Sequence, residues 1–118
     1  MQNIRLCERM LKDDYGEPDV GIKTYCGEEV SANILEVEAG TTGYKGGDSG
    51  NGCRAYFRIE NLASSDLRVN AYEKKFGSMG VEVTTGGDTE LYTLIEALKF
   101  IVNVLENGET GVNDKLIG

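Results

Sequence analysis

The stretch DTELYTLIEALKFIVNVLENG, residues 88–108, decides the fold. Its apolar residues recur at the i, i+3, i+4 and i+7 spacing of an amphipathic helix: Leu91, Leu94, Ile95, Leu98, Val102 and Leu105. Asp88 or Thr89 can cap the N-terminus, and Gly108 is typical of the position just beyond a helix C-terminus. The sequence therefore predicts one helix of about 18 residues that packs its apolar stripe on a core.

Three more residues, Phe100, Ile101 and Val104, widen the apolar face of this helix beyond the stripe. Burying a side chain of this size is worth about 1.5–3 kcal/mol, so we expect none of the three to remain in water. In so small a domain, the sequence predicts that they contact another subunit of a symmetric oligomer.

Upstream of the helix, alternating residues predict strands. In ILEVEA, residues 34–39, Leu35, Val37 and Ala39 face one way and the two glutamates face the other. The other predicted strands are 20–25, 53–60, 66–72 (with Leu67, Val69 and Ala71 inward) and 81–84, the last with antiparallel pairing. Together these elements predict a small α+β domain with an antiparallel sheet packed against one long C-terminal helix.

The N-terminal region gives a weaker pattern. Residues 3–12 place Ile4, Cys7 and Leu11 at helical spacing, which favours a short helix, although Ile4 and Leu6 also fit a strand. Turns are predicted at 13–19 and at Gly27. A chain of 118 residues is one domain's worth of sequence, so 1–118 is predicted as a single domain, with the role of 1–30 left open and 109–118 as a loose tail.

Composition excludes several function classes. The chain contains no histidine, which removes serine and cysteine triads and zinc–histidine sites. A net charge of −8 disfavours long nucleic acids. No apolar run has the roughly 18 residues that a membrane span needs, and the charges at Arg5, Glu8 and Arg9 do not fit a signal peptide. Three cysteines, Cys7, Cys26 and Cys53, are expected to be reduced, buried thiols in a cytosol.

Glycine is the compositional outlier, and six of the 16 glycines fall in GTTGYKGGDSGNG, residues 40–52. Its GDSG segment resembles a protease nucleophile but lacks a histidine base. Its GYKG segment fits the GxxG clamp of a KH domain. A KH clamp joins two helices, however, whereas this segment joins two predicted strands. No Gly-Lys-Ser/Thr of a Walker loop follows. Before the helix, Gly86-Gly87-Asp88 could hold an anion, but a plain helix cap is favoured.

A locally basic cluster accompanies this loop, because Lys45, Arg54 and Arg58 outnumber Asp48 between residues 40 and 58. Glycine amides and arginine forks suit phosphates, and tyrosine rings can stack on a base. The alternative is an ordinary solvated strand face. The candidate ligand-binding residues are Thr42, Gly43, Tyr44, Lys45, Gly46, Gly47, Asp48, Arg54, Tyr56, Arg58 and Arg68, the last expected on the neighbouring strand.

No catalytic residue, metal ligand or cofactor is predicted. The carboxylates Glu36, Glu38, Glu60 and Glu82 are explained by outward strand positions, and no pair of them has the spacing that acid–base catalysis needs.

Residues 33–105 resemble a family of small phage proteins, the first family of Thoeris anti-defence sponges. The resemblance rests on ILEVEAGTTGYKGGDSGNGCRAYFRIENL, DLRVN and GGDTELYTLIEALKF, most of all on its Gly-Thr-Thr-Gly, Gly-Gly-Asp and Arg positions. It implies a non-enzymatic protein that sequesters cyclic ADP-ribose isomers in the host bacterial cytoplasm. It also implies binding of cyclic oligonucleotide signals at separate sites, and assembly as dimers or hexamers.

Three functions therefore stay open. The chain is a nucleotide-binding sponge, a protein–protein inhibitor or small structural phage protein with an acidic surface, or a small enzyme that uses carboxylates. The partners expected for the first are a small nucleotide second messenger and further copies of the chain, with no membrane and no long nucleic acid.

Overall fold

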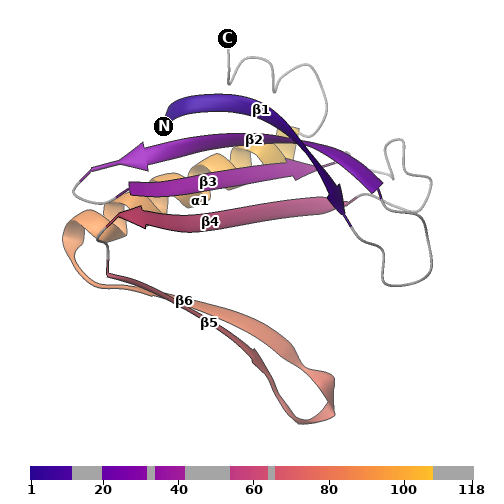
Figure 1. Ribbon diagram of the computed structural model, residues 1–118. Helices are drawn as coiled ribbons and strands as arrows, with labels where there is room; N and C mark the ends of the chain where they lie inside the picture. Colours follow the sequence, from indigo (N-terminus) through magenta and orange to yellow (C-terminus); the bar gives the residue numbers. More distant parts are fainter. Residues whose placement is uncertain (12–19, 32–33, 42–53, 64–65, 108–118) are drawn as a thin grey trace.

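The computed structural model describes residues 1–11, 20–31, 34–41, 54–63 and 66–107 and has an α+β fold (Figure 1). One sheet contains four antiparallel strands in the order β1-β2-β3-β4, namely Gln2–Leu11, Val20–Val30, Ile34–Thr41 and Ala55–Ala63. A separate hairpin consists of β5 (Leu67–Glu73) and β6 (Met79–Thr85). Helix α1 (Asp88–Asn107) packs against the four-stranded sheet, which confirms the predicted fold class.

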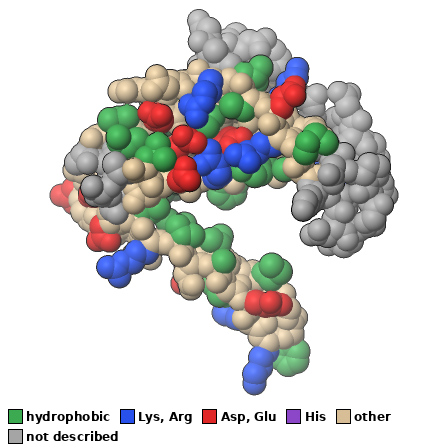
Figure 2. All heavy atoms as spheres, in the orientation of Figure 1, with side chains coloured by type: hydrophobic (Ala, Val, Ile, Leu, Met, Phe, Trp, Pro, Cys, Tyr) green, Lys and Arg blue, Asp and Glu red, His purple; other side chains and the backbone are tan. Residues whose placement is uncertain are grey.

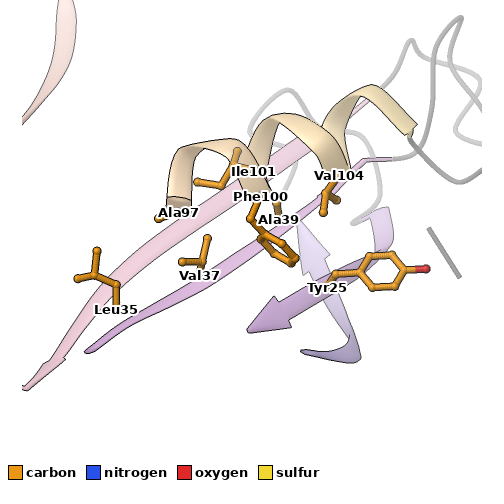
Figure 3. Close-up of a cluster of buried hydrophobic side chains, with 8 residues drawn as sticks. All are labelled: Tyr25, Leu35, Val37, Ala39, Ala97, Phe100, Ile101 and Val104. Atoms are coloured by element: carbon orange, nitrogen blue, oxygen red, sulfur yellow. The ribbon is translucent and has the colours of Figure 1, made fainter. Parts of the chain in front are cut away.

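The core lies between α1 and one face of the sheet. Phe100, Ile101 and Val104 of α1 are buried with Leu35, Val37 and Ala39 of β3, as the inward alternation of residues 34–39 predicted (Figure 3). Tyr25 of β2 and Ala97 of α1 complete the cluster. A strictly alternating strand therefore provides the surface on which the helix packs.

The sequence analysis assigned mostly the wrong side of α1 to the core, although Leu105 of the predicted stripe does pack against it. Phe100, Ile101 and Val104 are buried within the chain rather than left for another subunit. The side chains that remain exposed belong instead to the predicted core stripe: Leu91, Ile95, Leu98 and Val102. Both sides of this helix are apolar, so spacing alone could not tell which one meets the sheet.

The N-terminal segment is a strand, and the helix predicted over residues 3–12 is wrong. Arg5 pairs with Cys26, Cys7 with Thr24 and Arg9 with Ile22 along β1 and β2. The turn predicted at Gly27 is also wrong, because β2 continues through it to Val30. A Cβ on Gly27 would lie 2.8 Å from the Met1 side chain, so the glycine permits close contact with β1 rather than a turn.

The two strands predicted over 66–72 and 81–84 pair antiparallel, as expected, but they do not join the main sheet. Their hairpin extends away from the body as an arm (Figure 1). Leu67 at its base packs on the core, whereas Val69 and Ala71, predicted inward, are exposed. At the tip, Phe76 and Gly77 both have positive φ, +69° and +81°, which reverses the chain tightly.

Several predictions concern segments that lie outside the described residues, namely the turn at 13–19, the loop at 42–52, Cys53 and the tail. Of the other two cysteines, Cys26 is buried and Cys7 is half-buried rather than buried, and both thiols are free. Within the described ranges, no helix is long and apolar enough to cross a membrane.

Candidate functional site

The face of the sheet opposite α1 carries ionised side chains where the helix face carries apolar ones. Strand alternation brings Arg5 and Arg9 of β1, Glu36 and Glu38 of β3, and Arg58 and Glu60 of β4 to this outer face. We call these six residues the arginine–glutamate cluster. Three guanidinium groups balance three carboxylates in it, so the cluster as a whole is neutral.

Arg58 lies at the centre of the arginine–glutamate cluster. Its Nε donates to Glu38 Oε1 at 3.1 Å, and its Nη2 donates to Glu36 Oε1. Its Nη1 lies 3.4 Å from Glu60 Oε2. Glu38 is the direct cross-strand partner of Arg58, so the sheet register itself forms this pair.

Glu38 is the most deeply buried charge of the cluster, with 2% of its surface exposed. Its Oε2 accepts hydrogen bonds from Arg9 Nε at 2.6 Å and Thr24 Oγ1 at 2.7 Å. Burial alone raises the pKa of Glu38, but the hydrogen bonds from Arg9, Thr24 and Arg58 outweigh it and hold the pKa at about 2. The hydrogen bond from Arg58 likewise lowers the pKa of Glu36. Both carboxylates are therefore ionised at neutral pH.

An open depression of about 540 Å³ lies over the β1 side of this cluster. The side chains of Arg5 and Arg9 line it and remain 46% and 42% exposed. The guanidinium of Arg9 also stacks over the ring of Tyr56 at 5.0 Å. Figure 2 shows the basic and acidic side chains side by side on this face of the sheet. The depression therefore presents the partly exposed guanidinium groups of Arg5 and Arg9 among the carboxylates of Glu8, Glu36 and Glu38, and Arg9 also contacts the ring of Tyr56 beside it.

The structure brings together part of the predicted ligand site. Tyr56 and Arg58 share the outer face, as predicted, and the same alternation places Arg54 at the end of their row. Thr41 Oγ1 donates to the carbonyl of Arg54 at 2.9 Å, which links the end of β3 to the residue that precedes β4. The residues Thr42, Gly43, Tyr44, Lys45, Gly46, Gly47 and Asp48 lie outside the described residues.

Arg68 does not belong with this group. It was expected on a strand next to Arg58, but it lies on the exposed hairpin arm, where its Nε is 3.6 Å from Asp66. The hairpin is not hydrogen-bonded to β4, so the topology separates Arg68 from the outer face. The assignment of Arg58 to a ligand is also weakened, because its donors are occupied by Glu36, Glu38 and Glu60.

Sequence reasoning missed Arg5 and Arg9, which both line the open depression. Ile4 and Leu6 gave a weak strand signal in this segment, and Glu8 interrupts the alternation before Met10. The helical reading of residues 3–12 concealed it. With this segment taken as a strand, the two arginines would have been predicted on one face.

Cys26, whose sulfur lies 3.8 Å from Arg58 Nη2 beside the arginine–glutamate cluster, is poorly suited to act as a nucleophile. Burial raises the pKa of the Cys26 thiol to about 11, so at neutral pH it stays protonated and weakly nucleophilic. In the part of the chain that the structure describes, no group of three or more cysteine, aspartate or glutamate side chains could hold a metal ion.

The depressed pKa of Glu38 predicts a loss of stability in acid. The folded-state pKa of about 2 lies below the ordinary 4.5, so this carboxylate stabilises the fold above pH 4.5. That contribution should fall as the pH drops from about 4.5 towards 2. Urea unfolding should give a lower free energy of unfolding at pH 3 than at pH 7 for wild type. The difference between the two pH values should be smaller for Glu38→Gln. An equal acid loss in both proteins would contradict this assignment.

Comparisons of the chain with protein-family models, curated proteins and solved structures found no match.

Proposed function

We propose that this chain is a non-enzymatic phage anti-defence sponge. It binds cyclic ADP-ribose isomers, and also cyclic oligonucleotide signals of bacterial immunity, in the cytoplasm of the host. The ligand's phosphates lie against the arginines at the β1 side of the outer face and beside the glycine-rich segment. An adenine ring of the ligand stacks on the ring of Tyr44 or Tyr56. The protein holds this ligand without altering it.

The observation that carries this proposal is the position of Arg9. Its guanidinium stacks on Tyr56 while its side chain also lines the open depression. Arg5 lines the same depression, and Arg54, which directly precedes β4, lies two residues before Tyr56. A phosphorylated ligand there would meet the guanidinium groups of Arg5 and Arg9, which also pair with Glu36 and Glu38, and would take charge-assisted hydrogen bonds from their remaining donors. The overall charge of −8 would still repel long polyanions.

The protonation states favour binding over catalysis. A general acid or base works best with a pKa near the operating pH. Glu38 has a pKa of about 2 and Cys26 of about 11, so neither readily exchanges a proton at neutral pH. The arginine–glutamate cluster instead supplies a fixed charge pattern against which a ligand can be oriented.

The direct test is recovery of an unaltered ligand. The purified full chain is incubated with a cyclic ADP-ribose isomer, separated from free nucleotide and then heated. A sponge retains the nucleotide through the separation and releases it with its mass and chromatographic position unchanged. An altered product would indicate an enzyme, and no retention would favour a protein–protein inhibitor or a structural phage protein.

Substitution of single cations should locate the site. Arg54→Ala and Arg9→Ala are each expected to weaken binding of the nucleotide by about 10- to 100-fold, since a charged hydrogen bond is worth about 1.5–3 kcal/mol. Lys45→Ala should cost less, because lysine acts as a point charge screened by water. Calorimetry on each variant measures these changes.

Arg68→Ala is the matched control, because it removes an arginine from the hairpin arm and should leave the affinity unchanged. If wild type binds and both Arg54→Ala and Arg9→Ala bind equally well, the nucleotide is held elsewhere, even if the protein is a sponge.

A further inference from the structure

Arg9 is held at two points and still keeps donors for a ligand. Its Nε donates to Glu38 Oε2 at 2.6 Å, and its guanidinium lies over the ring of Tyr56. Within the described ranges, the side chain makes its hydrogen bond through Nε alone, so both Nη groups keep their donors. The side chain is half-exposed and lines the open depression. Arg9 thus has two adjacent Nη groups in one plane, the arrangement that binds a phosphate through two parallel hydrogen bonds.

The other two arginines of the arginine–glutamate cluster are less suited to this role. Arg58 is half-buried and uses Nε, Nη1 and Nη2 on three different glutamates. Both Nη groups of Arg5 are engaged, because Nη1 donates to the carbonyl of Asn3 at 3.3 Å and Nη2 lies 3.4 Å from Glu36. Of the three arginines, Arg9 is therefore the one that the described residues leave with both Nη groups available.

The position of Arg9 depends on Glu38. The carboxylate of Glu38 is buried and also accepts from Thr24 Oγ1 at 2.7 Å and from Arg58 Nε at 3.1 Å. A buried acceptor held by two other donors cannot follow a moving side chain, so the hydrogen bond fixes Arg9 rather than Glu38. Without such a bond, an exposed arginine samples many rotamers, and ordering it when a ligand binds reduces the affinity.

The sheet leaves room for this arrangement at Gly40. Gly40 of β3 pairs with Thr24 of β2 on one side and with Tyr56 of β4 on the other. It lies two residues after Glu38 and therefore on the same outer face, where it has no side chain. A Cβ there would overlap the neighbouring backbone of β2. This close approach lets Arg9 cross the sheet from β1 to the ring on β4.

We propose that Glu38 is the positioning residue of an anion site: it holds Arg9 against Tyr56 so that the two Nη groups of Arg9 bind one phosphate group. This inference rests on the proposed function for the nature of the ligand. The contacts that fix Arg9 do not depend on it. Arg9 touches the anion, whereas Glu38 acts on it only through Arg9.

The sign of one substitution separates positioning from simple electrostatics. Glu38→Gln removes a negative charge next to the site, which by Coulomb attraction and repulsion alone should strengthen the binding of an anion. If Glu38 positions Arg9, the same change should instead weaken binding by about 2- to 10-fold, because Arg9 must then be ordered when the anion binds. Glu38→Asp keeps the charge but shortens the side chain by one methylene group, so it should weaken binding as well.

The experiment titrates the full chain with inorganic pyrophosphate while heteronuclear NMR follows the Arg9 Nε–H signal, which Arg9→Lys identifies. In wild type this proton should exchange with water more slowly than that of the exposed Arg68, and pyrophosphate should shift its signal. In Glu38→Gln and Glu38→Asp, exchange should be faster and the affinity lower. Glu28→Gln is the matched control and should change neither, because Glu28 lies on the same face, opposite Glu36, but outside the arginine–glutamate cluster.

Each outcome decides the proposal. Unchanged or tighter pyrophosphate binding in Glu38→Gln would overturn it, and so would slow exchange of the Arg9 proton that persists in that variant. If neither Glu38 variant folds, wild type decides alone: fast exchange at Arg9, or an Arg9 signal that pyrophosphate does not shift, would overturn it. Failure of the proposed function looks different. Pyrophosphate would then give the expected results, but the cyclic ADP-ribose isomer would not be retained by the protein.

Discussion

Arg58→Met is expected to destabilise the fold by about 3 kcal/mol, because it leaves the buried Glu38 and the half-buried Glu36 without their shared cation. Breaking a buried ion pair by removing one partner typically costs 3–5 kcal/mol. The lower end applies here, since Glu38 keeps its hydrogen bonds from Arg9 and Thr24, and Arg58 is itself 26% exposed. Methionine preserves most of the aliphatic stem, so the loss measures the charge rather than the packing. Urea unfolding at pH 7 gives the free energy.

The pH dependence identifies the cause of this loss. Without Arg58, the pKa of Glu38 should rise towards its ordinary value, so protonation relieves the variant at a pH where wild-type Glu38 is still ionised. The difference between wild type and Arg58→Met should therefore shrink from pH 7 to pH 3. A difference that stays constant would indicate lost packing instead.

Two further variants complete the test. Adding Glu38→Gln to Arg58→Met should recover part of the stability at pH 7, because it removes the buried carboxylate charge that has lost Arg58. Arg5→Met is the matched control. Its guanidinium is 46% exposed and lies 3.4 Å from Glu36, and exposed ion pairs contribute only about 0–1 kcal/mol.

The main sheet was predictable where one face of a strand is apolar and the other charged. Residues 34–39 alternate strictly, and their inward residues Leu35, Val37 and Ala39 are the buried ones. Residues 3–12 could not be assigned this way. Their edge strand covers little of the core, so Leu6 and Met10 remain exposed and the apolar period is weak. Tertiary pairing with β2, rather than local pattern, makes this segment a strand.

The candidate site was only partly predictable for the same reason. The outward direction of Tyr56 and Arg58 follows from alternation along β4. What alternation could not reveal is that Glu38 also points outward and yet is buried, because Arg9 and Arg58 cover it from two other strands. The sequence analysis treated Glu36 and Glu38 as solvated carboxylates. Partners 29 and 20 residues away from Glu38 depend on sheet order, which no local pattern contains.

Phe100→Ala is the second large effect that we expect, and it tests which side of α1 the core uses. Phe100 is 7% exposed and packs among Tyr25, Ala39 and Val104 (Figure 3). Truncating a buried phenylalanine typically costs about 3–5 kcal/mol, through lost apolar burial and the cavity left behind. Leu98 belongs to the stripe that the sequence spacing assigned to the core, but it is 45% exposed. Leu98→Ala should therefore cost less than about 1 kcal/mol.

Both substitutions should be measured at pH 7 and at the same protein concentration as wild type. Urea unfolding then gives the two costs directly, and the slope of the transition shows whether each variant still folds cooperatively. If α1 is seated as described, Phe100→Ala loses several times more stability than Leu98→Ala. A larger loss for Leu98→Ala would mean that the helix is rotated about its axis, with the apolar stripe that contains Leu98 packed on β3.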